Sequence, residues 1–169
     1  MPAPASVTIP NDTDIVIVRT FDAPRELVWR AHTEPQLMKR WMQGPPGWTL
    51  SVCEIDARPG GKFRNVFTQA GQQPLEVRGT FLEVDAPARW VHTEEYGPEG
   101  SSETPAAVET LVLTEKAGKT TLTLTMRYPS KEARDAAGQG TADGMEECYR
   151  RIDVLLNERM REPTTTRGR

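Results

Sequence analysis

Three polar residues are candidates for acid–base chemistry or for anchoring a ligand, and the first of them is His92. It shares one face of a strand-like stretch with Trp90 and Glu94, because successive side chains of a strand point to opposite faces. On a concave face, His92 would be a general acid or base, or a polar anchor for a ligand oxygen. The alternative is a surface or hydrogen-bonded structural histidine, and the strand pattern does not decide which face is inside.

Glu109 is the second polar candidate, since it shares a strand face with Leu111 and Leu113. A carboxylate on an inner face needs a partner such as Arg78 or Arg127, or it titrates with a raised pKa. The alternative is a solvated strand residue. The third candidate is Asn65, on an apparently buried face between two phenylalanines.

Aromatic residues from scattered segments are the most informative set. They are expected either to fill the core or to line a cavity and stack on a ring-bearing or acyl ligand. Together with two methionines and the polar candidates they form the predicted lining: Trp41, Trp48, Phe63, Asn65, Phe67, Phe81, Trp90, His92, Glu109, Met126, Met145 and Tyr149.

The sequence signatures of common enzyme sites are missing. We find no phosphate-binding loop, no dinucleotide fingerprint, no nucleophile elbow and no zinc-protease motif. His32 and His92 are the only histidines, and Cys53 and Cys148 match no metal-ligand spacing, which favours two buried free thiols. We therefore predict no metal, no cofactor and no catalytic residue.

Length and charge narrow the class of protein. The chain has 169 residues, the size of one domain, and 21 Lys plus Arg against 24 Asp plus Glu give a net charge of −3. This balance gives no electrostatic reason to expect nucleic acid. No apolar run reaches the length of a membrane span, and the start lacks the pattern of a signal peptide, so a cytoplasmic location is expected.

The elements that position the candidates follow from periodicity. We expect a flexible leader at 1–14, a ligand-binding domain at 15–161 and a disordered tail at 162–169. Asp22 is expected to cap the first of two short helices, which follow a strand at 15–21. Six further strands are predicted at 48–56, 62–68, 75–84, 89–96, 107–114 and 120–128, with a loop at 97–105.

A long amphipathic helix is predicted at 141–161, after a helical turn that Ser130 starts and that Gly138 and Gly140 break or bend. Its apolar stripe is Met145, Cys148, Tyr149, Ile152, Leu155, Leu156 and Met160. Such a stripe must be buried against the concave face of the curved antiparallel sheet. The fold class is therefore α+β, with six to seven strands around one long C-terminal helix.

Several local sequences resemble the START-like, or SRPBCC, superfamily. The first stretch is VRTFDAPRELVW at 18–29, which resembles the opening motif of the superfamily. Further stretches that resemble its motifs are LMKRW at 37–41, DARPGGKF at 56–63, GTFLEV at 79–84 and KEARD at 131–135. More narrowly, the chain resembles the bacterial branch of the heat-shock-protein-90 ATPase activator homologues. The resemblance covers residues 15–158 and implies a helix-grip fold with a hydrophobic cavity between sheet and helix.

The resemblance leaves three functions open. The first is binding of a hydrophobic or aromatic small molecule, the second is an enzyme like the polyketide cyclases and aromatases, and the third is a stress-related co-chaperone with a chaperone as its partner. Fold alone does not decide among them. Binding is favoured because catalytic motifs are absent, and monomer and homodimer are both compatible with the sequence.

Overall fold

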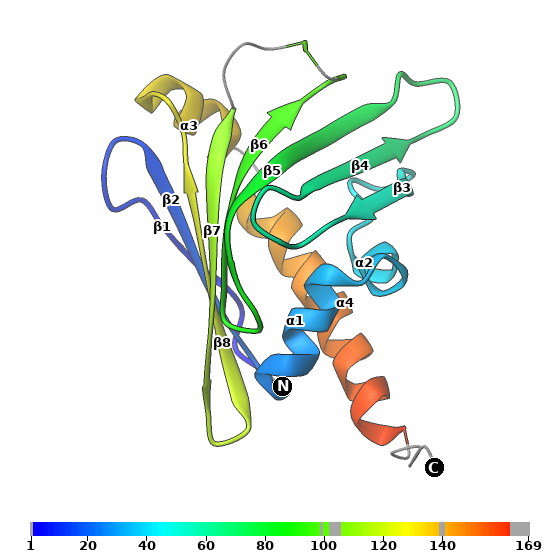
Figure 1. Cartoon of the computed structure of the whole chain (residues 1–169), viewed down its shortest axis with the longest axis vertical. Helices are drawn as coiled ribbons and strands as arrows, with labels where there is room; N and C mark the ends of the chain where they lie inside the picture. Colours follow the sequence, from blue (N-terminus) through cyan, green and yellow to red (C-terminus); the bar gives the residue numbers. More distant parts are fainter. Residues whose placement is uncertain (1, 99, 102–105, 139–140, 163–169) are drawn as a thin grey trace.

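A computed structural model describes residues 2–98, 100–101, 106–138 and 141–162. It confirms the α+β helix-grip architecture, in which a curved antiparallel sheet is covered on one side by helices (Figure 1). The helices are α1 (Arg25–Thr33), α2 (Pro35–Trp41), α3 (Lys131–Gly138) and α4 (Thr141–Arg161). The strands are β1 (Ser6–Thr8), β2 (Asp14–Phe21), β3 (Thr49–Ile55), β4 (Lys62–Thr68), β5 (Leu75–Asp85), β6 (Arg89–Tyr96), β7 (Ala107–Lys116) and β8 (Lys119–Arg127). Residues 163–169 of the tail expected at 162–169, positions 99 and 102–105 of the expected loop, and Gly140 lie outside the described residues.

The eight strands form one sheet in the order β1-β2-β8-β7-β6-β5-β4-β3, each antiparallel to its neighbour. The strand β2 pairs along its whole length with β8, from Asp14 opposite Arg127 to Phe21 opposite Thr120. This pairing brings the first long strand beside the last one. In Figure 1, β2, β8 and β7 stand nearly upright, whereas β5, β4 and β3 turn over towards the helices.

The N-terminal segment differs from the expected boundary. Residues 6–8 lie within the segment predicted to be a leader, yet they form the edge strand β1, with Val7 opposite Ile17 of β2. The strand raises the strand number above the six to seven expected. Its pairing satisfies backbone groups of β2 that would otherwise form an open sheet edge.

The predicted cap of the first helix is wrong. The N-cap residue of α1 is Pro24, with no side-chain cap, and Asp22 instead pairs with Lys119 at 3.3 Å. The backbone N–H of Arg25 donates to the Glu115 carboxylate at 2.6 Å. A carboxylate from β7 therefore satisfies the helix terminus, which local sequence could not reveal.

The long helix has the predicted bounds and buries most of its predicted stripe. Tyr149, Ile152, Leu155 and Leu156 are almost fully buried. The prediction that Met160 is buried with the stripe is wrong, since 53% of this residue is exposed. In Figure 1 the last turns of α4 lead away from the sheet, so no strand covers this end of the helix.

Arg19 fixes α4 against the sheet. It lies on the inner face of β2 and is only 2% exposed. Its guanidinium donates to both carboxylate oxygens of Asp153, at 3.1 and 2.7 Å, and to Glu146 at 3.3 Å. Two carboxylates that stand two turns apart on one helix thus pair with a single buried cation.

The backbones of β5 and β6 approach each other closely at Gly79 of β5. A Cβ atom at this position would lie 1.8 Å from the Thr93 carbonyl oxygen and 2.6 Å from the ring of Phe63. Gly79 lies between the Arg78–Glu95 and Phe81–His92 pairs, next to the shift of register between Phe81 and Glu83. Only a residue without a side chain allows the two backbones to approach so closely.

We predict that Gly79→Ala destabilises the protein by about 3 kcal/mol or more, because backbone atoms must move to admit the methyl group. Chemical denaturation followed by circular dichroism measures this loss. Gly144→Ala is the matched control, since Gly144 has no atom within 4 Å of an added Cβ and lies in α4. It should stabilise by roughly 0.5–1 kcal/mol through helix propensity. Equal stability of the two variants would contradict this account of the close approach.

Candidate functional site

A cavity of about 400 Å³ lies between the inner face of the sheet and the helices. Strands β4 to β8 supply most of its wall, and β2, β3 and all four helices supply the rest. Its lining is predominantly apolar and aromatic, as is usual for small-molecule sites. The lining side chains are Ile17, His32, Met38, Trp41, Met42, Ile55, Phe63, Asn65, Phe67, Val77, Phe81, Trp90, His92, Glu94, Tyr96, Glu109, Leu111, Leu122, Leu124, Met126, Tyr128, Ala137, Met145, Cys148 and Tyr149.

The structure brings eleven of the twelve predicted lining residues around this cavity; their role in ligand binding stays a prediction. They are Trp41, Phe63, Asn65, Phe67, Phe81, Trp90, His92, Glu109, Met126, Met145 and Tyr149. Trp48 is not among the lining side chains. Its N–H closes a turn onto the Pro45 carbonyl at 3.0 Å, one residue before β3 begins, so strand alternation does not place it on the inner face.

Aromatic rings from three neighbouring strands form the floor of the cavity. The ring of His92 lies 4.6 Å from that of Phe63, 5.4 Å from that of Phe81 and 5.7 Å from that of Trp90, between ring centroids. Trp90 also contacts Trp29 of α1, at 5.4 Å. These tilted and edge-on contacts hold His92 and Trp90 in one orientation.

His92 and Glu109 form an ion pair directly across β6 and β7. The Nε2 atom of His92 donates to the Glu109 carboxylate, and its Nδ1 atom donates to the Thr93 carbonyl at 3.0 Å. Burial lowers the pKa of His92, but the charge and hydrogen bond of Glu109 outweigh burial, so the pKa is raised. Since both ring nitrogens face acceptors, this geometry favours the imidazolium form of His92 and makes it a poor base.

The partner of Glu109 differs from the two arginines expected for it. Arg78 pairs with Glu95 at 3.1 Å, and Arg127 pairs with Asp14 at 2.9 Å. The pairing register of β6 and β7 places His92, and no arginine, opposite Glu109. A single sequence does not give that register, so the error was one of strand pairing.

Glu94 lies two residues beyond His92 on the same face of β6 and also lines the cavity. Its Oε2 atom is inaccessible to solvent and has no hydrogen-bond partner within the described residues. Burial raises the pKa of Glu94 to about 7; the Glu109 charge adds to the rise, and the His92 charge opposes it. Glu94 therefore changes charge near neutral pH.

Three further buried polar atoms on the cavity wall have no hydrogen-bond partner among the described residues: Tyr149 Oη, Asn65 Oδ1 and Trp90 Nε1. Asn65 makes one weak contact, from its Nδ2 atom to the Met42 sulfur at 3.7 Å. Folded proteins leave few such atoms unsatisfied, and those that remain call for a water, an ion or a ligand.

The candidate list from sequence omitted Glu94, Tyr96, Tyr128 and His32. Alternation from Trp90 already places Glu94 and Tyr96 on the face of His92, so that signal was present. Tyr128 follows β8 with the parity of Met126. His32 was hidden because its place depends on how α1 packs; its Nδ1 atom donates to the Val28 carbonyl at 2.7 Å, and burial lowers its pKa.

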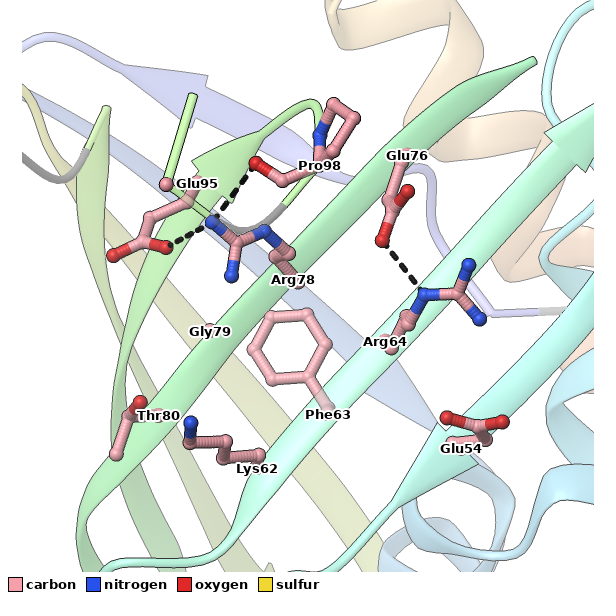
Figure 2. A pocket seen from close by; sticks show the side chains of 11 residues that line it. Glu54, Lys62, Phe63, Arg64, Glu76, Arg78, Gly79, Thr80, Glu95 and Pro98 are labelled. Atoms are coloured by element: carbon pink, nitrogen blue, oxygen red, sulfur yellow. Dashed lines mark hydrogen bonds and ion pairs between the residues drawn. The ribbon is translucent and has the colours of Figure 1, made fainter. Parts of the chain in front are cut away.

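A second and larger hollow, of about 730 Å³, lies on the opposite, outer face of β3 to β6 (Figure 2). Its charged side chains are largely engaged with one another. Arg64 donates to Glu76 at 2.7 Å, and Arg78 bonds Glu95 at 3.1 Å and the Pro98 carbonyl at 3.2 Å. An open hollow lined largely by charged side chains is less apolar than the interior cavity, so the interior cavity is the better candidate site for a small molecule.

Within the described residues, no cluster of three or more His, Cys, Asp or Glu side chains is arranged to hold a metal ion. Both cysteines are free thiols; Cys53 is buried, and Cys148 is partly buried on the cavity wall. None of the described helices is both long enough and apolar enough to span a membrane.

Comparison with known proteins places the chain in a family. Residues 22–157 match the family described as activator of Hsp90 ATPase homolog 1-like protein. The chain belongs to this family. No curated protein matches it in sequence.

Solved bacterial structures share this fold over nearly the whole chain. A crystal structure from Rhodobacter sphaeroides is 30% identical, with a TM-score of 0.83 over 92% of this chain and 99% of that one. A crystal structure from Nitrosomonas europaea is 27% identical, with a TM-score of 0.78 over 91% and 100%. A solution structure from Staphylococcus epidermidis is 26% identical, with a TM-score of 0.77 over 94% and 97%. These likenesses establish the family and the fold.

We predict that Glu94→Gln removes a pH-dependent loss of stability. The folded pKa of about 7 lies above the ordinary value of 4.5, so the folded protein binds more protons between these values and loses stability as the pH rises through them. The variant should match the wild type near pH 4 and exceed it by about 2 kcal/mol near pH 8. Denaturant unfolding at both pH values measures the difference.

Glu95→Gln is the control for this measurement, because Glu95 is the next residue of β6 and points to the outer face, where it pairs with Arg78. It should show no such gain at high pH. A gain of equal size in both variants would refute the assignment to Glu94.

Proposed function

We propose that the protein binds a hydrophobic or aromatic small molecule in the interior cavity. The observation that carries this proposal is an apolar cavity of about 400 Å³ whose wall also presents buried polar atoms that find no partner in the described part of the chain. A side-chain-filled core needs neither the space nor the unsatisfied atoms. Membership of the family supports a ligand-binding fold, and the identity of the ligand does not follow from it.

A route into the cavity is part of the proposal. An open apolar hollow of about 340 Å³ adjoins it, and Phe67, Val77 and Tyr96 line both spaces. Tyr96 and Leu75 at this hollow are about half exposed. An exposed apolar rim that continues into an apolar interior is suited to admit an apolar molecule.

We predict that Val77→Trp weakens binding of the neutral fluorescent probe N-phenyl-1-naphthylamine by about tenfold or more, because the larger ring fills the passage. Titration of probe fluorescence measures the affinity. Leu82→Trp is the matched control on the same strand, since Leu82 is 53% exposed and lines neither space. Absence of probe binding by the wild type, or equal weakening in both variants, would contradict the proposal.

An enzyme of the cyclase kind is a second candidate, and the observation that favours it is Glu94. A carboxyl group with a pKa of about 7 inside an apolar cavity is suited to take a proton from a carbon beside a carbonyl group. His92 is unsuited to this task because both of its nitrogens are already hydrogen-bonded.

If this second candidate holds, the wild type should accelerate deuterium exchange beside the carbonyl group of 4-phenyl-2-butanone, and Glu94→Gln should lower that rate by about 100-fold. Proton magnetic resonance in deuterated buffer follows the exchange, and Glu95→Gln should retain the wild-type rate. Exchange no faster than in buffer would remove the enzyme candidate and leave the binding proposal intact.

A further inference from the structure

The cavity wall carries acidic groups without a matching set of basic ones. Glu94 and Glu109 both line it, and no Lys or Arg of the described chain does. The imidazolium of His92 neutralises one carboxylate, Glu109, through their ion pair. When Glu94 is ionised, the cavity therefore has a net negative charge that the described protein groups do not balance.

The unsatisfied atoms also have a common character. Glu94 Oε2 and Asn65 Oδ1 only accept hydrogen bonds, and Tyr149 Oη accepts as well as donates. Trp90 Nε1 is the only one that solely donates. Tyr149 and Asn65 are 1% and 5% exposed, so bulk water does not satisfy them. A ligand that fits this wall must supply hydrogen-bond donors.

Aromatic side chains make up much of the remaining surface. Trp41, Phe63, Phe81, Trp90 and Tyr128 line the same space as the carboxylates. Aromatic faces attract organic cations, and the attraction is strongest where water is excluded. Carboxylates together with aromatic rings form a favourable setting for an ammonium group on an apolar body.

We infer that the cavity selects a hydrophobic molecule that carries a protonated amine, with Glu94 as the counter-charge. This inference rests on the proposed binding function and names its ligand class. A fatty acid or another carboxylate of the same shape is disfavoured, because its charge would meet Glu94 without a neighbouring Lys or Arg. A neutral alcohol satisfies acceptors but leaves the carboxylate charge unbalanced.

Glu94 also couples binding to pH. The titratable groups that share the cavity with it are His92, Tyr96, Glu109, Tyr128, Cys148, Tyr149 and His32. Burial, and then the Glu94 charge, raise the pKa of Tyr128 to about 12, so this phenol stays neutral near pH 7. A bound ammonium favours the ionised form of Glu94, so the complex forms more readily as the pH rises through about 7.

The test uses three probes with one naphthalene body: 2-naphthylmethylamine, 2-naphthalenemethanol and 2-naphthoate. Isothermal titration calorimetry gives their affinities for the wild type at about pH 6 and about pH 8. We expect the amine to bind about tenfold or more tightly than the alcohol at the higher pH, and the carboxylate to bind most weakly. The affinity for the amine should rise several-fold between the two pH values, and that for the alcohol should not.

Glu94→Gln should remove both the preference for the amine and its pH dependence, while the affinity for the alcohol stays within about twofold. Glu95→Gln, on the outer face of the same strand, should behave as the wild type. Should Glu94→Gln fail to fold, the wild-type pH series decides alone. Equal affinity for amine and alcohol, or an unchanged preference in Glu94→Gln, overturns the inference.

The neutral probe N-phenyl-1-naphthylamine separates this failure from that of the proposed function. If it binds while the amine shows no advantage over the alcohol, the charge selectivity is wrong and the binding proposal stands. If neither the neutral probe nor any naphthalene probe binds, the binding proposal itself is overturned, and the inferred ligand class is overturned as well.

Discussion

The buried guanidinium of Arg19 determines how the long helix lies against the sheet. It bonds Asp153 and Glu146, which stand two turns apart on one side of α4, and Tyr149 lies between them. Because a cation inside the fold is costly unless it is paired, this arrangement allows little sliding or rotation of the helix. The ion pairs of Arg19 with Asp153 and Glu146 therefore fix the position of Tyr149 on the cavity wall and keep the helix over the concave face.

The cavity follows from that helix position and from the bend of the sheet. Gly79 lets β5 and β6 approach closely, and β4 and β3 turn over towards α2 (Figure 1). One straight helix cannot fill the space under a sheet that bends away from it. Side chains from both layers fill the region around Ile152 and Leu155, and a gap remains between the aromatic strands and the first turns of α4.

Much of this arrangement was predictable, because it depends on local periodicity. Alternation grouped His92 with Trp90 and placed Glu109 on one face with Leu111, but only the structure shows that both faces are inner ones. The three-to-four spacing predicted the bounds of α4. What failed depends on contacts between distant segments. The partner of Glu109 depends on the register of β6 and β7, and the capping of α1 depends on Glu115. The burial of Arg19 depends on the docking of α4. The pairing of segments that are distant in the sequence cannot be predicted from local periodicity.

Glu94 explains why a binding site is a better interpretation than an imperfect core. Natural sequences agree with their folds at most positions, and exceptions gather at functional sites. Glu94 is partly buried, and its inner oxygen has no partner among the described residues, so its ionisation destabilises the fold. A leucine or glutamine there would avoid that cost. The neighbouring His92 and Glu109 show that this strand region can pair a buried charge within the protein. Glu94 lies on the same face, two residues away, and its Oε2 atom has no partner among the described residues, so a group supplied by a ligand would complete the pairing there.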